Sequence, residues 1–228
     1  MKNNMTGGQL TQIYTIATQQ GCGQDAVQFL IESGYMADFF AGRWQEVDRT
    51  QFRKIAKLAP EDFGVKPDFK TWRTVKLGTG LKTADDFRKA HKKADCKIGD
   101  WGNDILGKPA FEQSVAEKET EVELVNVSVA ELGFKDGATR KDIYNRAQEL
   151  GLDLCPAEVG PQLRLQYQDQ PKGEWVVIAM EPISDSYGSL SVFLVRRLDG
   201  GEQWLSADFG YPDGIWGGNG RFVFVRRK

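Results

Sequence analysis

The last quarter of the chain has the clearest alternation of hydrophobic and polar residues. Three runs there, Glu174–Ile183, Ser191–Arg197 and Arg221–Arg227, are rich in Val, Ile, Phe and Trp, and a shorter run, Gln203–Asp208, lies between them. A repeat of two residues is typical of a strand with one buried face. The pattern therefore predicts a mostly antiparallel sheet at the C-terminal end.

Helical periodicity dominates the first part of the chain. Apolar residues recur there at spacings of three and four in short segments that end at glycines or at Pro60. Short amphipathic helices can bury their apolar stripes only against one another or against a partner. We therefore expect a helical module at 1–60. Proline and glycine among charged residues predict a linker at 61–70, with a second domain at 71–228.

The second domain mixes strand and helix patterns. The predicted elements are strands at Thr71–Leu77, Val122–Val129 and Leu163–Tyr167 and helices that begin near Thr83 and Thr139. Asp86 and Asp142 follow these threonines at the spacing of a capping box. Because strands and helices do not alternate regularly, the pattern favours an α+β fold over a doubly wound one.

Composition and charge narrow the class of protein. The chain is 40% hydrophobic and 27% charged, with a net charge of −2. A bulk nucleic-acid or membrane-surface binder normally has a strong basic excess, which is absent here. No apolar run approaches the roughly 20 residues that span a bilayer. Cys22, Cys96 and Cys155 lie far apart without a CxxC pair, so we expect reduced thiols and a cytoplasmic location.

The chain offers little catalytic or metal-binding chemistry. A catalytic base must lie beside its nucleophile. The chain's single histidine, His91, lies instead between lysines on a predicted helix surface. One histidine and three scattered cysteines lack the paired spacing of a zinc site. The loop Gly78-Thr79-Gly80 matches neither GxxxxGK nor GxGxxG, and a tight turn explains its glycines. We therefore predict no enzyme activity, no metal and no cofactor.

Four aspartates keep an enzyme open as a further alternative. They lie in the C-terminal region, where they could converge on an acid/base or metal site: Asp185, Asp199, Asp208 and Asp213. Asp199 and Asp213 each precede a glycine, so turn chemistry already accounts for two of them.

Residues 184–220 have the composition of a recognition surface. The segment is rich in Ser, Tyr, Trp and Asn and contains eight glycines. Rigid aromatic side chains give contact area at low entropic cost, while Ser, Gly and Asn adapt to a ligand. We therefore expect a non-catalytic protein that binds a protein or other macromolecular ligand. The predicted ligand-binding residues are Tyr187, Ser189, Leu194, Arg196, Leu198, Gln203, Ser206, Phe209, Tyr211, Ile215, Trp216 and Asn219.

A cluster of basic residues at 76–97 supports an alternative function. Its cations could contact phosphates in a nucleic-acid-associated accessory protein: Lys76, Lys82, Arg88, Lys89, Lys92 and Lys93. The second helix of a helix-turn-helix would have to enter the major groove, yet that segment offers Asp100 and Asp104. A solvated helix face explains the cluster better.

Four segments resemble a family of uncharacterised bacterial proteins. They are FKTWRTVKLGTG at Phe69–Gly80, IGDWGNDILGKPAF at Ile98–Phe111, LGLDLCPAEVGPQLRLQYQDQPKGEWVVIAMEPISDS at Leu150–Ser186 and RFVFVRR at Arg221–Arg227. The resemblance covers about 67–228. Members of that family are alike up to about Ile183 and differ between there and the closing strand.

This layout is similar to the variable proteins of diversity-generating retroelements, whose C-terminal segment is rewritten at chosen codons on a fixed scaffold. The resemblance implies a C-type-lectin-like fold and diversified codons within 187–220. The implied positions are Tyr187, Ser189, Leu194, Arg196, Leu198, Glu202, Gln203, Ser206, Phe209, Gly210, Tyr211, Gly214, Ile215, Gly217, Gly218, Asn219 and Gly220.

Overall fold

The computed structural model describes residues 69–227, which belong to the second of two units of the chain, Pro67–Lys228. The predicted helical module at 1–60 and most of the predicted linker lie outside the described residues. The helices are α5 (Ala84–Lys93), α6 (Asp100–Leu106), α7 (Pro109–Glu112), α8 (Arg140–Glu149) and α9 (Val159–Gln166). The strands are β1 (Arg73–Leu77), β2 (Lys97–Ile98), β3 (Thr120–Ser128), β4 (Ala138–Thr139), β5 (Leu152–Asp153), β6 (Trp175–Ile178), β7 (Ile183–Ser184), β8 (Leu190–Arg197), β9 (Gln203–Phe209), β10 (Ile215–Trp216) and β11 (Arg221–Arg226).

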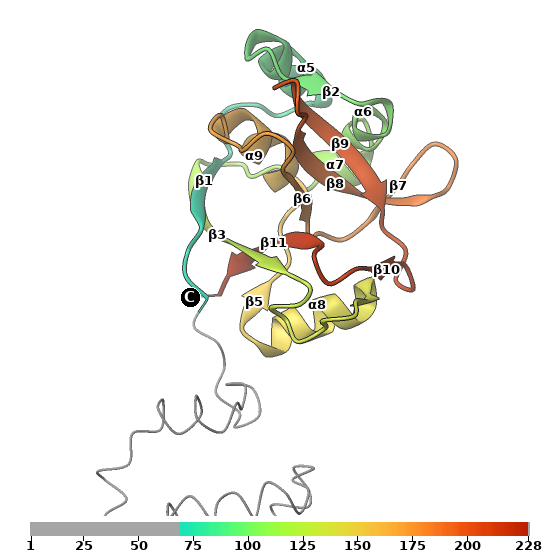
Figure 1. Ribbon diagram of the computed structural model, residues 1–228. Coiled ribbons are helices and arrows are strands. Elements are labelled where there is room, and N and C mark those ends of the chain that lie inside the picture. Colours follow the sequence, from blue (N-terminus) through green and yellow to red (C-terminus); the bar gives the residue numbers. More distant parts are fainter. Residues whose placement is uncertain (1–68, 228) are drawn as a thin grey trace, which may run out of the picture. The chain divides into compact units, whose positions relative to one another are not determined.

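A mixed, curled sheet forms the centre of this domain (Figure 1). Its main path runs β1-β3-β11-β6-β8-β9-β2, while β5 pairs with β11 and β7 with β8. Most neighbours are antiparallel, whereas β6 runs parallel to β11 and β2 parallel to β9. The separate pair β4–β10 is antiparallel. The predicted α+β class is confirmed, and the C-type-lectin-like assignment stays a prediction.

The helix starts follow the local sequence. Thr83 and Asp86 form a complete capping box at α5, and the Thr139 side chain accepts a hydrogen bond from the backbone N–H of Asp142 at α8. Each cap satisfies an N–H that has no partner within its helix. Gly151 follows α8 with a positive φ of 90°, a conformation that favours glycine. Both predicted helices are confirmed.

The strand predicted at Leu163–Tyr167 is wrong, because most of these residues lie in α9. Alternation of Leu and polar residues suggested a half-buried strand, but Arg164 is fully buried and Leu165 only partly so. The α9 helix is enclosed over most of its surface, so its side chains do not sort into one apolar and one polar face. A Cβ on Gly160 would come within 2.7 Å of the Phe193 side chain, and this glycine therefore lets α9 pack closely on β8.

The predicted single strand Glu174–Ile183 is also wrong in its extent. It is divided into β6, which pairs with β8 and β11, and β7, which pairs with the other end of β8. Between them the backbone N–H of Met180 donates to the hydroxyl of Tyr144, in α8, at 3.2 Å. The side chain of α8 thus replaces a strand neighbour at the break.

The two faces of the sheet are covered differently. On one face α9 and α6 pack against β8 and β9, and Phe193 is fully buried there. On the other face the ring of Tyr144, from α8, lies 6.2 Å from that of Phe222 and 6.0 Å from that of Phe224, in β11. The register places Leu194 on the same face as Phe222, through Val177 between them. We call the part of this second face over β6, β8 and β9 the open face.

The loop Gly78-Thr79-Gly80 forms a tight turn, as expected. Gly78 and Gly80 have φ values of 63° and 91°. The backbone N–H of Gly78 donates to the buried carboxylate of Glu158 at 2.8 Å, and the same carboxylate accepts from the N–H of Ala116 at 2.8 Å. A side-chain anion of the protein therefore already binds this loop.

Candidate functional site

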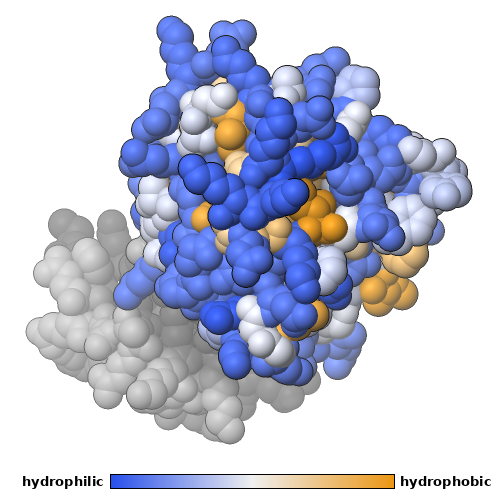
Figure 2. Space-filling model, turned by 90° about the horizontal axis from the view of Figure 1, so that it is seen from above, coloured by the Kyte–Doolittle hydropathy of each residue, from blue (hydrophilic) through white to orange (hydrophobic). Residues whose placement is uncertain are grey.

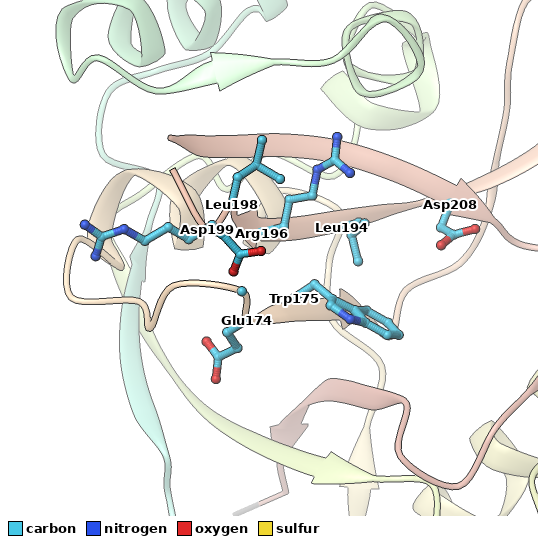
Figure 3. Close-up of a pocket in the computed structure, with 9 residues that line it drawn as sticks. Glu174, Trp175, Leu194, Arg196, Leu198, Asp199 and Asp208 are labelled. Atoms are coloured by element: carbon cyan, nitrogen blue, oxygen red, sulfur yellow. The ribbon is translucent and has the colours of Figure 1, made fainter. Parts of the chain in front are cut away.

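A groove of about 350 Å³ runs along the open face. Trp175 of β6 stands opposite Arg196 of β8, and Leu194 lies two pairs further along. Figure 3 shows these three side chains between Asp199 at one end of the groove and Asp208 at the other. The groove therefore combines an aromatic ring, an aliphatic side chain and charges of both signs.

Arg196 stacks on an aromatic ring at the groove and forms no ion pair with any residue of 69–227. Its guanidinium carbon lies 5.7 Å from the ring centroid of Trp204, which stands opposite in β9. Among the described residues, three buried polar atoms of this face have no hydrogen-bond partner: Arg196 Nε, Trp204 Nε1 and Ser206 Oγ. A stacked guanidinium with free donors can bind an acceptor group of a ligand.

A second cavity, of about 560 Å³, lies beside the loop from β9 to β10. Phe209, Tyr211, Ile215 and Trp216 supply its apolar lining, and Asp208 and Asp213 supply its carboxylates. The rings of Phe209 and Tyr211 lie 6.5 Å apart in a tilted arrangement. Ile215 is 80% exposed and Phe209 is 68% exposed, so these two side chains are available to a partner.

A third cavity, of about 190 Å³, lies between α6 and the loop from β7 to β8. Its lining combines Trp101 and Phe209 with polar residues of that loop and of β8 and β9: Asp185, Ser189, Ser191 and Asp208. Exposed Tyr187 packs its ring against Trp101 at a centroid distance of 5.6 Å. The cavity wall is therefore aromatic on the α6 side.

The loop beside this third cavity is fastened to α6. Asp104 accepts hydrogen bonds at 2.6 Å from both the backbone N–H and the hydroxyl of Ser186. Lys108 donates to the Ser186 hydroxyl at 2.6 Å and pairs with Asp104 at 3.1 Å. These donors, Ser186 first, hold the pKa of Asp104 below its usual range. The contacts give the loop a fixed position over α6.

Asp208 connects the three cavities, because it lines all of them. Phe209 lines two of them. We call the residues that line these three cavities, together with Tyr187, the three-cavity surface. In the view of Figure 2, apolar side chains lie in separate patches among hydrophilic ones. Such a surface offers a ligand apolar side chains to pack against, with polar side chains around them.

Most of the predicted ligand-binding residues lie on this surface. Those that line a cavity are Ser189, Leu194, Arg196, Leu198, Phe209, Tyr211, Ile215 and Trp216. Tyr187 joins them through its contact with Trp101. Segments separate in the sequence are thus brought together.

Three of the predicted residues do not project outward as expected. Leu194 is only 8% exposed because it lies on a central strand, β8. Ser206 is 7% exposed because it lies beside Gly99. Gln203 instead bonds within the protein: its amide donates to the Gln168 carbonyl at 2.9 Å. Asn219 is exposed but lies outside the linings of the three cavities.

Trp216 contributes to the core as well as to the surface. Its ring lies 5.0 Å from that of Phe222 and 6.5 Å from that of Trp175, so it packs against the core while lining a cavity. Trp175 is exposed at the start of β6. Trp101 was missed as a site residue, and Asp208 was considered only for an acid/base or metal site, since only the fold brings α6 against the end of β9.

The basic residues of the alternative function lie on β1, on α5 and in the loop between them. Lys76 pairs with Glu119 at 3.0 Å, and this contact raises the pKa of the lysine. Arg88 pairs with Asp85 at 2.8 Å and bonds Asn103 at 2.7 Å. Both cations are thus already compensated, while Lys82, Lys89, Lys92 and Lys93 are exposed. Their role in binding nucleic acid stays a prediction.

His91 is not on the helix surface, as we expected, but fully buried. Its Nδ1 lies 2.8 Å from the carbonyl oxygen of Phe87, and burial lowers the pKa of the imidazole to about 4. The thiols of Cys96 and Cys155 are free and buried, and burial raises the pKa of Cys155. Within 69–227, no group of three or more His, Cys, Asp and Glu residues could hold a metal ion.

The chain matches no protein-family model, curated protein or solved structure with which it was compared. In the part that the structure describes, no helix is long and apolar enough to cross a membrane.

Proposed function

We propose that this domain is a non-catalytic binding domain whose three-cavity surface docks a protein or other macromolecular ligand. One observation supports this most directly. In the described part of the chain, every large hydrophobic residue that is exposed lies on that surface: Trp101, Trp175, Tyr187, Phe209, Tyr211 and Ile215. Exposed apolar side chains gathered on one region, with polar groups around them, are typical of interaction sites.

The anchors of the interface would be Phe209, Tyr211 and Ile215, which surround the largest of the three cavities. Burying large aromatic and aliphatic side chains in a well-packed contact supplies most of the binding energy of an interface. Arg196 and Asp208 would add charge-assisted hydrogen bonds that fix the orientation of the ligand. No covalent chemistry is required of any of these groups.

We also propose that this surface is diversified, as the resemblance to retroelement variable proteins implies. Two features support the idea. The backbones of β8 and β9 are paired along their length, so side-chain changes leave the ladder intact. The implied positions Phe209, Tyr211 and Ile215 project from the fold, where substitutions are well tolerated.

A capture experiment tests the binding function. The full chain is immobilised and exposed to lysate of its source cells, beside the double variant Phe209→Ala/Ile215→Ala. We expect a retained macromolecule that is lost with the double variant, because the variant removes two exposed anchors without disturbing the core. Melting temperatures are measured for both proteins as a check of folding.

The matched control is Lys89→Ala/Lys93→Ala, which changes two exposed residues of α5. Capture unaffected by this control agrees with the proposal. Loss of capture with the lysine control and retention with the Phe209/Ile215 variant would contradict it. That reversed pattern, with nucleic acid in the retained material, would favour the accessory function of the basic cluster.

A further inference from the structure

The third cavity contains acceptor groups that the fold leaves without partners. Asp185 and Ser191 line it and are only 7% and 6% exposed. Oδ1 of Asp185 accepts the backbone N–H groups of Tyr187 and Ser189, each at 2.8 Å. Within 69–227, neither Asp185 Oδ2 nor the Ser191 hydroxyl has a hydrogen-bond partner. Both groups can therefore accept hydrogen bonds from a donor that enters the cavity, and the charge of Asp185 favours a cationic donor.

The other residues that line the cavity also favour a cation, because their charge is negative. Asp208 is a second carboxylate in the lining, and its Oδ1 accepts the backbone N–H of Phe209 at 2.7 Å. Among the described residues, no lysine or arginine lines this cavity. Lys108, on the same side of the domain, is already paired with Asp104 and Ser186. A positively charged group from outside would therefore meet two carboxylates.

Aromatic rings complete the enclosure. Trp101 and Phe209 line the cavity, and the contact with Tyr187 fixes one side of the Trp101 ring. The face of an aromatic ring attracts a cation within about 6 Å of its centroid. Both the rings and the carboxylates thus favour a cation with an apolar stem.

Size and donor geometry select among cations. About 190 Å³ is less than the roughly 300–1,000 Å³ of a pocket for a drug-sized molecule, so the space suits one side chain. A guanidinium binds best to both oxygens of a carboxylate, but Oδ1 of Asp185 already accepts two backbone N–H groups. An ammonium group has three donors. Asp185 Oδ2 and the Ser191 hydroxyl offer it two acceptors, and Asp208 adds negative charge at the cavity edge.

We propose that this cavity binds the ammonium group of a lysine side chain presented by a protein partner. The inference rests on the proposed binding function and names one element of what is recognised. The aliphatic stem of the lysine would lie between Trp101 and Phe209, with its charge beside Asp185.

A peptide titration tests this on the full chain. The probe is an acetylated and amidated peptide with one lysine between glycines, and the indole N–H of Trp101 is followed by NMR. Its resonance is assigned from Trp101→Phe. We expect a saturable shift with the lysine peptide, a much smaller one with the arginine peptide, and none with the uncharged norleucine peptide. Equal responses to the lysine and norleucine peptides, or tighter binding of the arginine peptide, would overturn the proposal.

Asp185→Asn tests the carboxylate directly, because the amide oxygen can still accept the N–H groups of Tyr187 and Ser189. We expect Kd for the lysine peptide to rise about tenfold or more, the effect of losing one charge-assisted hydrogen bond. The matched control is Asp213→Asn, which removes a carboxylate from the neighbouring cavity and should change Kd less than about twofold. An unchanged Kd in Asp185→Asn, in a protein with an intact NMR spectrum, would also overturn the proposal.

This titration and the capture experiment fail independently. A captured macromolecule that needs Phe209 and Ile215, together with no response to the lysine peptide, removes the lysine site and leaves the binding function. Lysine binding without any captured macromolecule leaves the site and removes the proposed function.

Discussion

Neighbouring residues of β8 belong to two regions with different tasks. Phe193 and Val195 point toward α9 and α6 and are fully buried, whereas Leu194 and Arg196 point to the open face and line a groove. The same alternation continues in β9, where Leu205 is buried and Asp208 joins three cavities. Stability and recognition are thus separated by single steps along a strand.

This separation explains how a recognition surface can vary on a fixed fold. Side chains of the covered face determine how the helices pack, and those of the three-cavity surface mostly contact solvent. Substitutions on the second set should therefore change what is bound more than how stably the domain folds. The following predictions test where this separation holds and where it breaks.

The largest contrast is expected between two Phe→Ala substitutions on neighbouring strands. Phe193→Ala should lower the free energy of unfolding by about 3–5 kcal/mol, because it empties the space between Phe111 and Gly160. Phe209→Ala should lower it by less than about 0.5 kcal/mol, since that ring is exposed. Urea unfolding measures both, and similar losses for the two variants would contradict the separation of buried from exposed residues.

The covered side should also make stability depend on pH through His91. Its pKa of about 4 in the folded state lies below the roughly 6.5 of an unfolded chain. The unfolded state therefore binds the proton first, and stability should fall by about 3 kcal/mol as the pH drops from 7 to 4. Because His91 is the chain's one histidine, His91→Asn should remove most of the change between pH 7 and 5.5. A curve unaffected by this substitution would show that other groups are responsible.

Trp216 should be an exception to this separation, because it lies on the three-cavity surface and also packs on the core. We expect Trp216→Ala to lose about 1–3 kcal/mol through its lost contacts with Phe222 and Trp175. Its neighbour Ile215 is exposed, so Ile215→Ala should lose less than about 0.5 kcal/mol. Thermal unfolding of the two variants makes the test, and equal melting temperatures would place Trp216 among the purely exposed residues.

The smallest effect is expected at Asp104, which fastens the loop over α6. Its lowered pKa means that it stabilises the fold above the ordinary carboxyl pKa of about 4. This contribution should disappear as the pH falls through the lowered value in the folded state. Asp104→Asn should increase amide exchange at Ser186 and Tyr187 at neutral pH and leave exchange in β8 unchanged. No local increase at neutral pH would contradict the fastening role.

Local signals in the sequence predicted much of this fold. The helix caps at Thr83 and Thr139 depend only on residues within the next turn. The alternation in β8, β9 and β11 can likewise be read from adjacent residues. The α9 helix was mistaken for a strand because its burial depends on packing against β1, β8 and β9. His91 was misplaced for the same reason, since tertiary contacts decide which helix face is covered.

The candidate site was predictable only in part. Exposed aromatics such as Phe209 and Tyr211 stand out in a segment rich in glycine and serine. Asp208 and Trp101 do not, because nothing in the sequence indicates that α6 reaches the end of β9. Register also had to be known before Leu194 could be placed beside Trp175 and Val177.

The most direct test of a diversified recognition surface is to sequence many copies of this gene from one source population. We expect the copies to differ mainly at exposed positions of 187–220, such as Phe209, Tyr211 and Ile215. Phe193, Val195 and Leu205, which lie in the same segment but face the covered side, should stay constant. Differences spread evenly over exposed and buried positions, or over the whole domain, would contradict this expectation.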